Sequence, residues 1–406
     1  MAVIGIIATL DTKGPETAFL RDRIEEAGHK ALILDSGMLF PPAIEPDISR
    51  HELLAAAGVD DLEAYRANGK AALQKAMSQG VRLTLQRLAK EGKIQGVLSV
   101  GGGQGSAMSS YAMQGLPVGF PKVLVSTVAC GTARFGDYVG NRDIVMIPSI
   151  SDICGLNAIT IPIFSSGVGA VCGMVEMAER APYVTNKPVV GLTMAGVTTE
   201  CVMRLKKILD ERGYETIVCH CNVVGAVVLD ELAAEGKIAG VIDVTPHDVG
   251  GYLYDGLMAA DEHRFENIYA AGIPVITAPG AVDFQLKGPV AELPEELKGR
   301  AYNIHTPFHT HVRASYEDMY RVGTYITEKH NGAKGPNAIM VPLRGYSQQN
   351  REGRVLYDEH ANQGFTDAVK AKKADTVLYI EKDMHMNDPE FALALADEFE
   401  KLYKGE

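Results

Sequence analysis

Two distant stretches of the chain are nearly identical, and this repetition constrains the fold more than any other feature. EGKIQGVLSV at 91–100 and EGKIAGVIDV at 235–244 agree at seven of ten positions. Each stretch ends a predicted helix and begins an apolar strand, which leads into a loop rich in Gly or Thr. Shorter echoes flank both stretches in the same order, at 116–131 and 270–283. We interpret the repetition as an internal duplication.

The unit that is repeated is a strand, a helix and a second strand. Residues 2–10 are apolar and β-branched, as expected of a parallel strand buried on both faces. A polar turn at 11–16, a helix ending at Gly28 and a strand from residue 30 follow. The same order recurs from residue 187. The sequence therefore predicts an α/β fold of two doubly wound, Rossmann-like parallel sheets, with a ligand cleft between the two subdomains.

A chain of 406 residues is too long for one ordinary core, so two domains are expected. We predict an N-terminal nucleotide-binding subdomain at 1–182, with a helical insertion at about 38–85. A hinge at 183–186, beside two prolines, separates it from a C-terminal subdomain at 187–406.

The composition restricts the partners. The formal net charge is −12 and there is no basic run, which argues against nucleic acid and anionic membranes as partners. No apolar stretch of membrane-spanning length and no signal peptide is expected. The six cysteines are scattered, and the close pair in Cys219-His220-Cys221 lacks a second pair that would complete a zinc site. These features predict a cytoplasmic protein with reduced thiols.

The segment SVGGGQGSAMSS, at 99–110, is the strongest candidate for a phosphate-binding loop. Glycines allow close approach of a ligand to main-chain N–H groups, and the following helix would add its positive end. Ser106 would cap that helix or bind a phosphate oxygen. The pattern fits neither standard phosphate-binding motif, and a tight turn remains the alternative. The candidate cofactor-binding residues here are Gly101, Gly102, Gly103, Gln104, Gly105 and Ser106.

Other loops at the same predicted edge add polar groups. Lys13 could offset phosphate charge, and Asp11 could hold Mg²⁺ through water, although Asp11 and Thr12 also suit a helix N-cap. Asp35 ends the second strand, where an acidic residue can bind a ribose or simply form a turn. Ser126 and Thr127 supply another hydroxyl-rich loop. These six residues are further cofactor-binding candidates, and Asp11 is the metal candidate.

The second half offers histidines instead of glycines. His247 and Asp248 follow a predicted strand, and His305 begins a run that continues with His309 and His311. A metal-binding role for that run competes with partly exposed loop histidines. Arg344 after the strand NAIMV suits an anion clamp or a structural salt bridge. The candidate catalytic residues are His247, Asp248, His305 and Arg344.

Several motifs occur together in a characteristic order, among them TLDTKGPETAFL, GGGQGS, SDICGLN, GLTMAGVTTECV, MVPLRGYS and HMNDPEFA. From about residue 3 to 402 the chain resembles the ATP-binding family that includes the N-terminal region of the plant tobamovirus-resistance protein. The resemblance implies two Rossmann-like subdomains, ATP with Mg²⁺ as a ligand, and a homodimer. The glycine segment departs from the family's usual G-G-S-G-G-T, and His309 and His311 are additional.

Three functions are consistent with these features. The first is an ATP-dependent enzyme acting on a small anionic metabolite, by phosphoryl or nucleotidyl transfer or by carboxylate activation. The second is a nucleotide-responsive binding module without turnover. The third is a non-nucleotide isomerase or lyase that uses His and Asp side chains.

Overall fold

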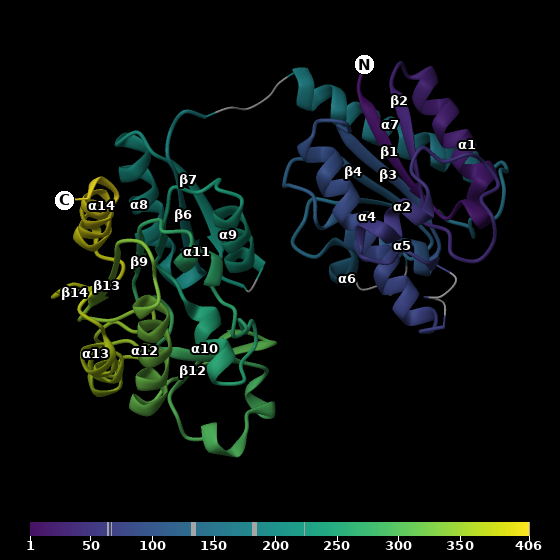
Figure 1. Ribbon diagram of the computed structural model, residues 1–406. Coiled ribbons are helices and arrows are strands. Elements are labelled where there is room, and N and C mark those ends of the chain that lie inside the picture. The colour runs from purple at the N-terminus through teal and green to yellow at the C-terminus, as the bar shows by residue number, and fades with distance from the viewer. Residues whose placement is uncertain (63–64, 66, 131–134, 181–184, 223, 406) are drawn as a thin grey trace. The chain divides into compact units, whose positions relative to one another are not determined.

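The computed structural model describes residues 1–62, 65, 67–130, 135–180, 185–222 and 224–405. The chain divides into two compact units, Met1–Tyr183 and Val184–Glu406 (Figure 1). The end of the predicted N-terminal subdomain and the first two residues of the predicted hinge, 183 and 184, lie outside the described residues.

The N-terminal unit is built on one parallel sheet of five strands in the order β2-β1-β3-β4-β5. Its central strands are almost wholly buried and rich in Val, Ile and Leu, as parallel strands covered on both faces require. The strands are β1 (Val3–Ala8), β2 (Lys30–Asp35), β3 (Gly96–Gly101), β4 (Lys122–Ser126) and β5 (Val145–Pro148).

Helices cover both faces of this sheet (Figure 1). Because side chains alternate along a strand, Ile6 packs with the helices of one face and Ile7 with those of the other. The first face carries α1 (Leu10–Glu26) and α7 (Thr160–Arg180). The second carries α2 (Arg50–Ala56), α4 (Lys70–Lys90) and α5 (Gly103–Met113), with the short α6 (Phe135–Val139) beside α5.

Two local predictions need correction. The polar turn expected at 11–16 is part of α1, which begins at Leu10 and is kinked at Lys13, where φ is −127° and ψ is 25°. The kink lies two residues before Pro15, whose ring disfavours helical geometry on its N-terminal side. The helical insertion contains α2 and the first part of α4, but α4 runs on to Lys90 and belongs to the sheet packing.

The expectation that no segment has membrane-spanning length is also corrected. Helix α7 has 21 residues and is long and apolar enough to cross a membrane by length and composition alone. In the structure its apolar stripe packs on the first sheet through Phe164, Val168 and Val171. A core helix has the same composition because its buried face is apolar.

The C-terminal unit repeats the plan with a parallel sheet of six strands in the order β14-β13-β9-β8-β6-β7. The strands are β6 (Val189–Met194), β7 (Glu215–His220), β8 (Gly240–Asp243), β9 (Val275–Thr277), β13 (Asn337–Pro342) and β14 (Val377–Lys382). In the first sheet β1 lies between β2 and β3, and in the second sheet β6 lies between β7 and β8 in the same way. This shared topology agrees with the duplication inferred from the sequence.

Helices again form two layers. α8 (Thr199–Glu211) and α14 (Pro389–Lys404) cover one face, where Leu205 and Phe399 share a core cluster with Ile242. The other face carries α9 (Val224–Ala234), α10 (His247–Leu253), α11 (Glu266–Ala270), α12 (Tyr316–Asn331) and α13 (Glu359–Lys372).

A small antiparallel sheet in the C-terminal unit was not expected from the sequence. It pairs β10 (Phe284–Lys287) with β12 (His309–Arg313), and β12 with β11 (Tyr302–Thr306). Two single-turn helices, Val290–Glu292 and Glu295–Leu297, connect β10 to β11. The sheet brings the histidine run of β11 and β12 beside Phe284, as described below.

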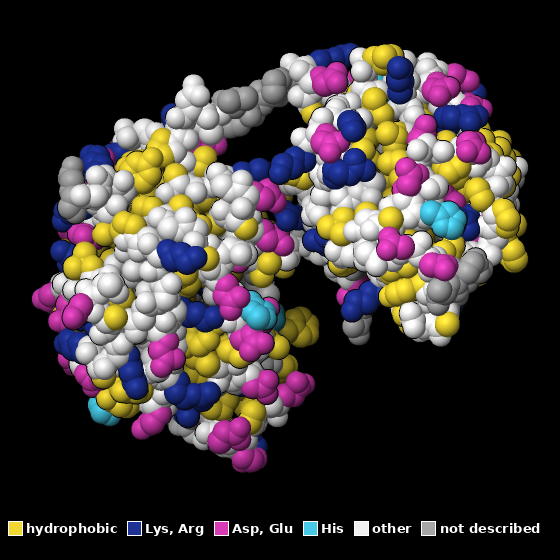
Figure 2. Space-filling view, in the orientation of Figure 1, with side chains coloured by type: hydrophobic (Ala, Val, Ile, Leu, Met, Phe, Trp, Pro, Cys, Tyr) yellow, Lys and Arg dark blue, Asp and Glu magenta, His cyan; other side chains and the backbone are white. Residues whose placement is uncertain are grey.

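In such doubly wound sheets, ligands bind at the carboxyl ends of the strands where the strand order reverses. That point lies between β1 and β3 in the first unit and between β6 and β8 in the second. On the face seen in Figure 2, Lys and Arg side chains alternate with Asp and Glu. The surface charges on this face therefore single out no ligand site. The two reversal points are the expected positions of a ligand.

Candidate functional sites

The glycine segment of the N-terminal unit is not a loop but the junction of a strand and a helix. Gly101 ends β3, Gly102 is the N-cap of α5, and Gly103 and Gly105 lie in its first turn. No side chain of a described residue caps this helix. Within the described part of the chain, the N–H groups of Gly103, Gln104 and Gly105 have no hydrogen-bond acceptor, whereas Ser106 N–H donates to the Gly102 carbonyl at 2.8 Å. The helix therefore presents three open donors at the β1/β3 reversal point.

Ser106 does not have the predicted capping role. It is fully buried, and its hydroxyl donates to the Gly101 carbonyl oxygen at 3.0 Å and shares a hydrogen bond with the Ser126 hydroxyl. Ser126 is buried as well, and its Oγ accepts from Val128 N–H at 3.1 Å. Both serines fasten α5 to the end of β4. Thr127 also has its hydroxyl beside the helix start. Its Oγ1 lies 3.9 Å from the position of a Cβ built on Gly102.

A cavity of about 330 Å³ adjoins the start of α5. Gln104 forms part of its wall and belongs also to the first turn of the helix. The other described residues of the wall are Lys70 and a mainly apolar set: Met38, Leu39, Gly69 and Leu73. Open N–H donors thus lie next to an apolar recess, which is the arrangement that a ligand with an anionic tail and a flat apolar body requires.

Asp11 and Lys13 reach the same edge but already have partners. Asp11 Oδ2 accepts hydrogen bonds from the N–H groups of Met38 at 3.0 Å and Leu39 at 2.8 Å, so it fixes one wall of the cavity. The Lys13 ammonium donates to the carbonyl oxygen of Ile153. Thr12 is exposed and its hydroxyl pairs with that of Thr9 at 3.1 Å. An ammonium has three donors and a carboxylate several acceptor sites, so both keep capacity for a ligand.

Asp35, for which the sequence allowed ribose binding or a turn, takes the second of these roles and also forms an ion pair. It is buried and forms an ion pair with Arg50, whose Nε lies 2.8 Å from Oδ2. Its Oδ1 accepts from the N–H groups of Leu10 at 3.2 Å and Gly37 at 2.9 Å. A buried charge needs such a complete set of partners, and this set leaves Asp35 no exposed oxygen. Asp35 therefore holds together the loops that follow β1 and β2.

The C-terminal unit carries a second cavity of about 330 Å³ at its own reversal point. We call it the imidazole pocket, because five of its lining residues are histidines. They come from the end of β7, the start of α10 and the β11–β12 hairpin, and the other residues are mainly apolar. The lining is Ala195, Gly196, Val197, His220, Cys221, His247, Met258, Phe284, Leu286, His305, His309 and His311.

His247 is held in a single tautomer. Its Nδ1 lies 2.7 Å from the carbonyl oxygen of Ala281, and because a carbonyl can only accept, Nδ1 carries the hydrogen. Nε2 then bears the lone pair, and no described residue donates to it. Burial lowers the pKa of His247, partly opposed by the Ala281 hydrogen bond and by Asp248. The neutral imidazole therefore offers a basic nitrogen in the pocket whose wall it forms.

His311 stands at the centre of a stack of rings. Its ring centroid lies 4.0 Å from that of Phe284 and 4.7 Å from that of His305, while His247 packs on Phe284 at 4.8 Å. His311 is only 5% exposed, and its Nδ1 is buried without a hydrogen-bond partner among the described residues. Burial, together with electrostatic interaction with the neighbouring imidazoles, lowers the pKa of His311 to about 3. His311 therefore lines the pocket as a neutral ring, and its buried Nδ1 lacks a partner among the described residues.

Main-chain donors complete the pocket. After β6 the chain forms a short 3₁₀ turn, η1 (Gly196–Thr198), which continues into α8. Among the described residues, the N–H groups of Gly196 and Val197 have no acceptor, although Thr198 N–H donates to the Ala195 carbonyl at 3.0 Å. First-turn N–H groups point away from a helix, toward whatever lies beyond its end. Both residues line the pocket.

Asp248, predicted to be catalytic, is fully buried behind the pocket. Arg264 donates to it at 3.0 Å and to Asp243 at 2.8 Å, and the Cys221 thiol donates to Asp248 Oδ1 at 3.0 Å. Burial by itself would raise the pKa of Asp248, but the Arg264 guanidinium outweighs it and holds this pKa below the ordinary value. Asp248 is therefore a structural anion beneath His247.

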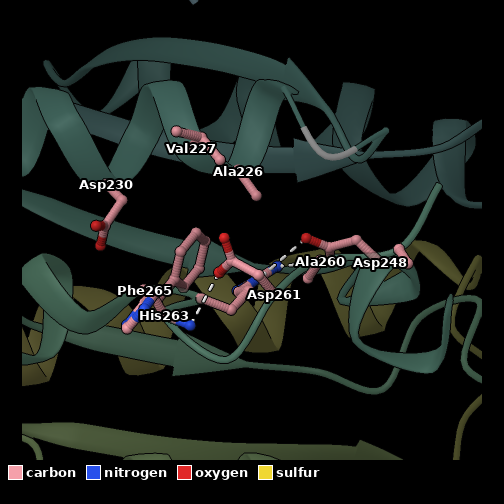
Figure 3. A pocket seen from close by; sticks show the side chains of 10 residues that line it. Ala226, Val227, Asp230, Asp248, Ala260, Asp261, His263 and Phe265 are labelled. Atoms are coloured by element: carbon pink, nitrogen blue, oxygen red, sulfur yellow. Dashed lines mark hydrogen bonds and ion pairs between the residues drawn. The ribbon is translucent and has the colours of Figure 1, made fainter. Parts of the chain in front are cut away.

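A smaller cavity of about 160 Å³ lies on the far side of this ion pair (Figure 3). Figure 3 shows Ala226, Val227 and Asp230 of α9 across from the segment that carries Asp261 and Phe265. Its charged groups are already paired: Asp230 accepts from Ile268 N–H at 2.9 Å, and Arg264 holds Asp248. This cavity offers a ligand few free polar atoms.

Arg344 lies apart from the imidazole pocket. It is largely exposed and forms a two-pronged ion pair with Asp383, with distances of 2.8 and 2.7 Å. It lines another cavity, of about 420 Å³, together with Arg351, Tyr357 and His385. The structure thus brings His247 and His305 together and places Arg344 in a separate recess.

The pocket includes residues that the sequence analysis did not select. His220 ends β7, and its position at the carboxyl end of a strand was a usable signal. Gly196 and Val197 lie in the small-residue turn after a predicted strand, which was another usable signal, whereas Phe284 gave none. Among the described residues, no three His, Cys, Asp or Glu side chains are arranged to hold a metal ion.

Comparison with known proteins identifies relatives along almost the whole chain. A UPF0261 protein of Clostridium tetani is 37% identical over 395 residues, covering 96% of each chain. The ToMV susceptible protein tm-1(GCR26) of Solanum lycopersicum is 30% identical over 97% of this chain, which spans 55% of the tomato protein. A UDP-GlcNAc 2-epimerase from Neisseria meningitidis is a distant structural neighbour, 12% identical over 68% of this chain and 82% of its own, with a TM-score of 0.24.

Family models match both halves. The N-terminal domain model of Uncharacterised protein family (UPF0261) matches residues 2–180, and the C-terminal domain model matches residues 187–403. The two matches coincide with the two units of the structure. The chain therefore belongs to the UPF0261 family, whose relatives include the tomato Tm-1 proteins.

Proposed function

We propose that the N-terminal unit binds ATP with Mg²⁺, and that the protein is an ATP-dependent enzyme acting on a small anionic metabolite. The observation that carries the proposal is the open start of α5, with three unpaired N–H donors among the described residues at the β1/β3 reversal point. Such a helix start favours phosphate through aligned N–H groups and the helix dipole.

The adjoining cavity supports a nucleotide rather than free phosphate. Gln104 belongs both to the helix start and to the cavity wall, so a ligand on the N–H donors can extend between Leu39 and Leu73. These side chains suit the flat apolar faces of a base, and Lys70 at the rim adds a positive charge. A volume of about 330 Å³ is that of a small-molecule site.

The residues at this edge also fit Mg²⁺ held mainly by the nucleotide. Magnesium keeps several waters and takes one or two protein oxygens besides phosphate oxygens. Asp11 Oδ1 and the hydroxyls of Thr12 and Thr127 are oxygen donors of this kind, whereas Asp11 Oδ2 is engaged with main-chain N–H groups. The bound ion would offset phosphate charge and orient the phosphates for transfer.

The C-terminal unit supplies the metabolite site in this proposal. The imidazole pocket has the volume for a small metabolite, and the Gly196 and Val197 N–H groups can receive its negative charge. No Lys or Arg lines this pocket among the described residues, so the anion would be bound by main-chain donors and imidazoles.

A charge placed in the first turn of α5 tests the nucleotide site. At Gly103 φ is not positive, and the atom nearest to an added Cβ, Val128 Cγ1, lies 3.9 Å away, so a side chain fits. Gly103→Asp adds a negative charge that stabilises a helix start but repels phosphate. The matched control, Gly103→Asn, has nearly the same shape without the charge.

Calorimetric titration with Mg-ATP is the measurement. We expect the parent and Gly103→Asn to bind, and Gly103→Asp to bind at least about tenfold more weakly while remaining folded. Absence of binding by the parent at millimolar Mg-ATP, or equal binding by both variants, contradicts the proposed site. ATP consumption with a series of carboxylates then separates an enzyme from a nucleotide-responsive binding module.

A further inference from the structure

The imidazole pocket combines four features that the nucleotide site does not explain. They are a basic ring nitrogen on His247, an unpaired ring nitrogen on buried His311, two open N–H donors at Gly196 and Val197, and an apolar wall. All of them border one cavity at the β6/β8 reversal point.

Buried His311 leaves one ring nitrogen without a partner among the described residues. An unpaired buried polar atom is costly, and native structures rarely leave one. The neighbouring rings, Phe284 and His305, stack on the faces of His311 and offer no hydrogen bond to its edge. His311 itself lines the cavity, so its ring is within reach of a bound molecule although Nδ1 is closed to solvent.

The donors at Gly196 and Val197 define the charge of that molecule. Two adjacent main-chain N–H groups at a helix start stabilise a carboxylate or an oxygen that becomes negative during a reaction. Both donors belong to η1, the turn that leads into α8, and not to α8 itself. With neutral imidazoles around it, such a site suits negative charge on oxygen next to an uncharged, partly apolar body.

We propose that the imidazole pocket catalyses proton transfer at the carbon next to a carbonyl group in small 2-oxo carboxylic acids. The Nε2 atom of His247 removes a proton from this carbon, and the electron pair of the broken C–H bond forms the enolate. The Gly196 and Val197 N–H groups hold the enolate oxygen. The His247 imidazolium then returns the proton to a carbon of the enolate, so no other reactant is needed.

The surroundings of His247 suit this role. The Ala281 carbonyl fixes Nδ1–H, which keeps Nε2 directed away from that contact, and burial lowers the pKa so that the ring is neutral at pH 7. The buried carboxylate of Asp248 stabilises the transient imidazolium form of His247. This inference rests on the proposed function only in that the pocket takes a small anionic metabolite; it does not require ATP.

The test uses the full chain and named probes. Pyruvate and 2-oxobutyrate are incubated with the protein in D₂O, without nucleotide, and NMR follows the loss of the C3 protons. Oxalate, a planar mimic of the pyruvate enolate, serves as a binding probe. The variant is His247→Asn, because the Asn amide can still donate to the Ala281 carbonyl but lacks the basic nitrogen. His360→Asn, an exposed position on α13 outside the pocket, is the matched control.

We expect the parent and His360→Asn to exchange the C3 protons of at least one 2-oxo acid, and His247→Asn to lose at least about 100-fold of that rate. Oxalate should bind to the parent and to His247→Asn alike, since the main-chain donors hold it, which shows that the variant is folded. No exchange above buffer with either acid, or undiminished exchange in His247→Asn, overturns the proposal.

The same assay separates this inference from the nucleotide site. Gly103→Asp, which lies in the other unit, should exchange protons at the parent rate. If Mg-ATP binding fails but exchange persists, the proposed nucleotide site is lost and the proton-transfer site stands. Exchange that requires Mg-ATP overturns the claim that the pocket acts without nucleotide.

Discussion

The guanidinium of Arg264 lies 2.8 Å from the carboxylate of Asp243, and both side chains are almost completely buried, at 5% and 1% exposure. Arg264 also reaches Asp248, the neighbour of His247, at 3.0 Å. One guanidinium is therefore the shared counter-ion of two buried carboxylates behind the imidazole pocket. It also couples the end of β8 to the start of α10, which carries His247.

Loss of this cation should destabilise the C-terminal unit strongly. In Arg264→Met the side-chain volume is largely kept, but Asp243 and Asp248 lose their counter-charge in a buried site. We expect the free energy of unfolding to fall by about 3–5 kcal/mol, as measured by urea denaturation. In the exposed Arg344–Asp383 pair, Arg344→Met should leave the free energy of unfolding nearly unchanged. Similar losses in the two variants contradict this account.

Asp11 is predicted to shape the nucleotide cavity through the main chain. Asp11→Ala removes the acceptor for the N–H groups of Met38 and Leu39, two residues of the cavity wall. We expect a loss of about 1–3 kcal/mol in stability and weaker Mg-ATP binding in calorimetry. Asp22→Ala, which removes only an exposed pair with Arg21, should change neither quantity appreciably. Unchanged binding in Asp11→Ala argues against this wall as part of the site.

His330 should make the C-terminal unit sensitive to acid. Its Nδ1 pairs with Asn337 Oδ1 at 3.0 Å and its Nε2 with Thr277 Oγ1 at 2.8 Å, so both nitrogens are engaged in the neutral form. Burial lowers the pKa of His330 to about 4. The unfolded chain takes up this proton near pH 6.5 and the folded chain does not. The contribution of neutral His330 to the stability of the folded state is therefore complete above pH 6.5, and it is lost as the pH falls toward 4.

The expected size follows from the linkage relation. Between pH 6.5 and pH 5 this group alone removes about 2 kcal/mol of stability. His330→Gln cannot take up the proton, so its stability should fall less than that of the parent between pH 7.5 and pH 5, by about that amount. Other titrating groups, such as Asp283, whose pKa burial raises to about 6, are common to both proteins and cancel. Equal falls in urea denaturation at the two pH values refute the prediction.

The sequence predicted the two sheets because their signals are local. Buried parallel strands are continuous apolar runs, and the repeat at 91–100 and 235–244 marks the same helix-to-strand junction in both halves. The position of the glycine segment after β3 also followed from that pattern. The sequence did not predict the exact form of this segment. α5 starts at Gly103 rather than after Ser106, and this start depends on how α5 packs on β3 and β4.

The roles of the polar residues depended on contacts between distant parts of the chain. From the sequence, Asp35 and Asp248 were candidate site residues. In the structure, Asp35 is paired with Arg50 and Asp248 is paired with Arg264. A carboxylate has the same identity in a site and in a buried ion pair, and only its neighbours in space distinguish the two. The sequence by itself therefore determined the repeated α/β plan and the edges at which ligands could bind. The tertiary structure decided which side chains at those edges remain free, because pairing of buried charges and stacking of rings such as His311 on Phe284 arise only when separate segments pack together.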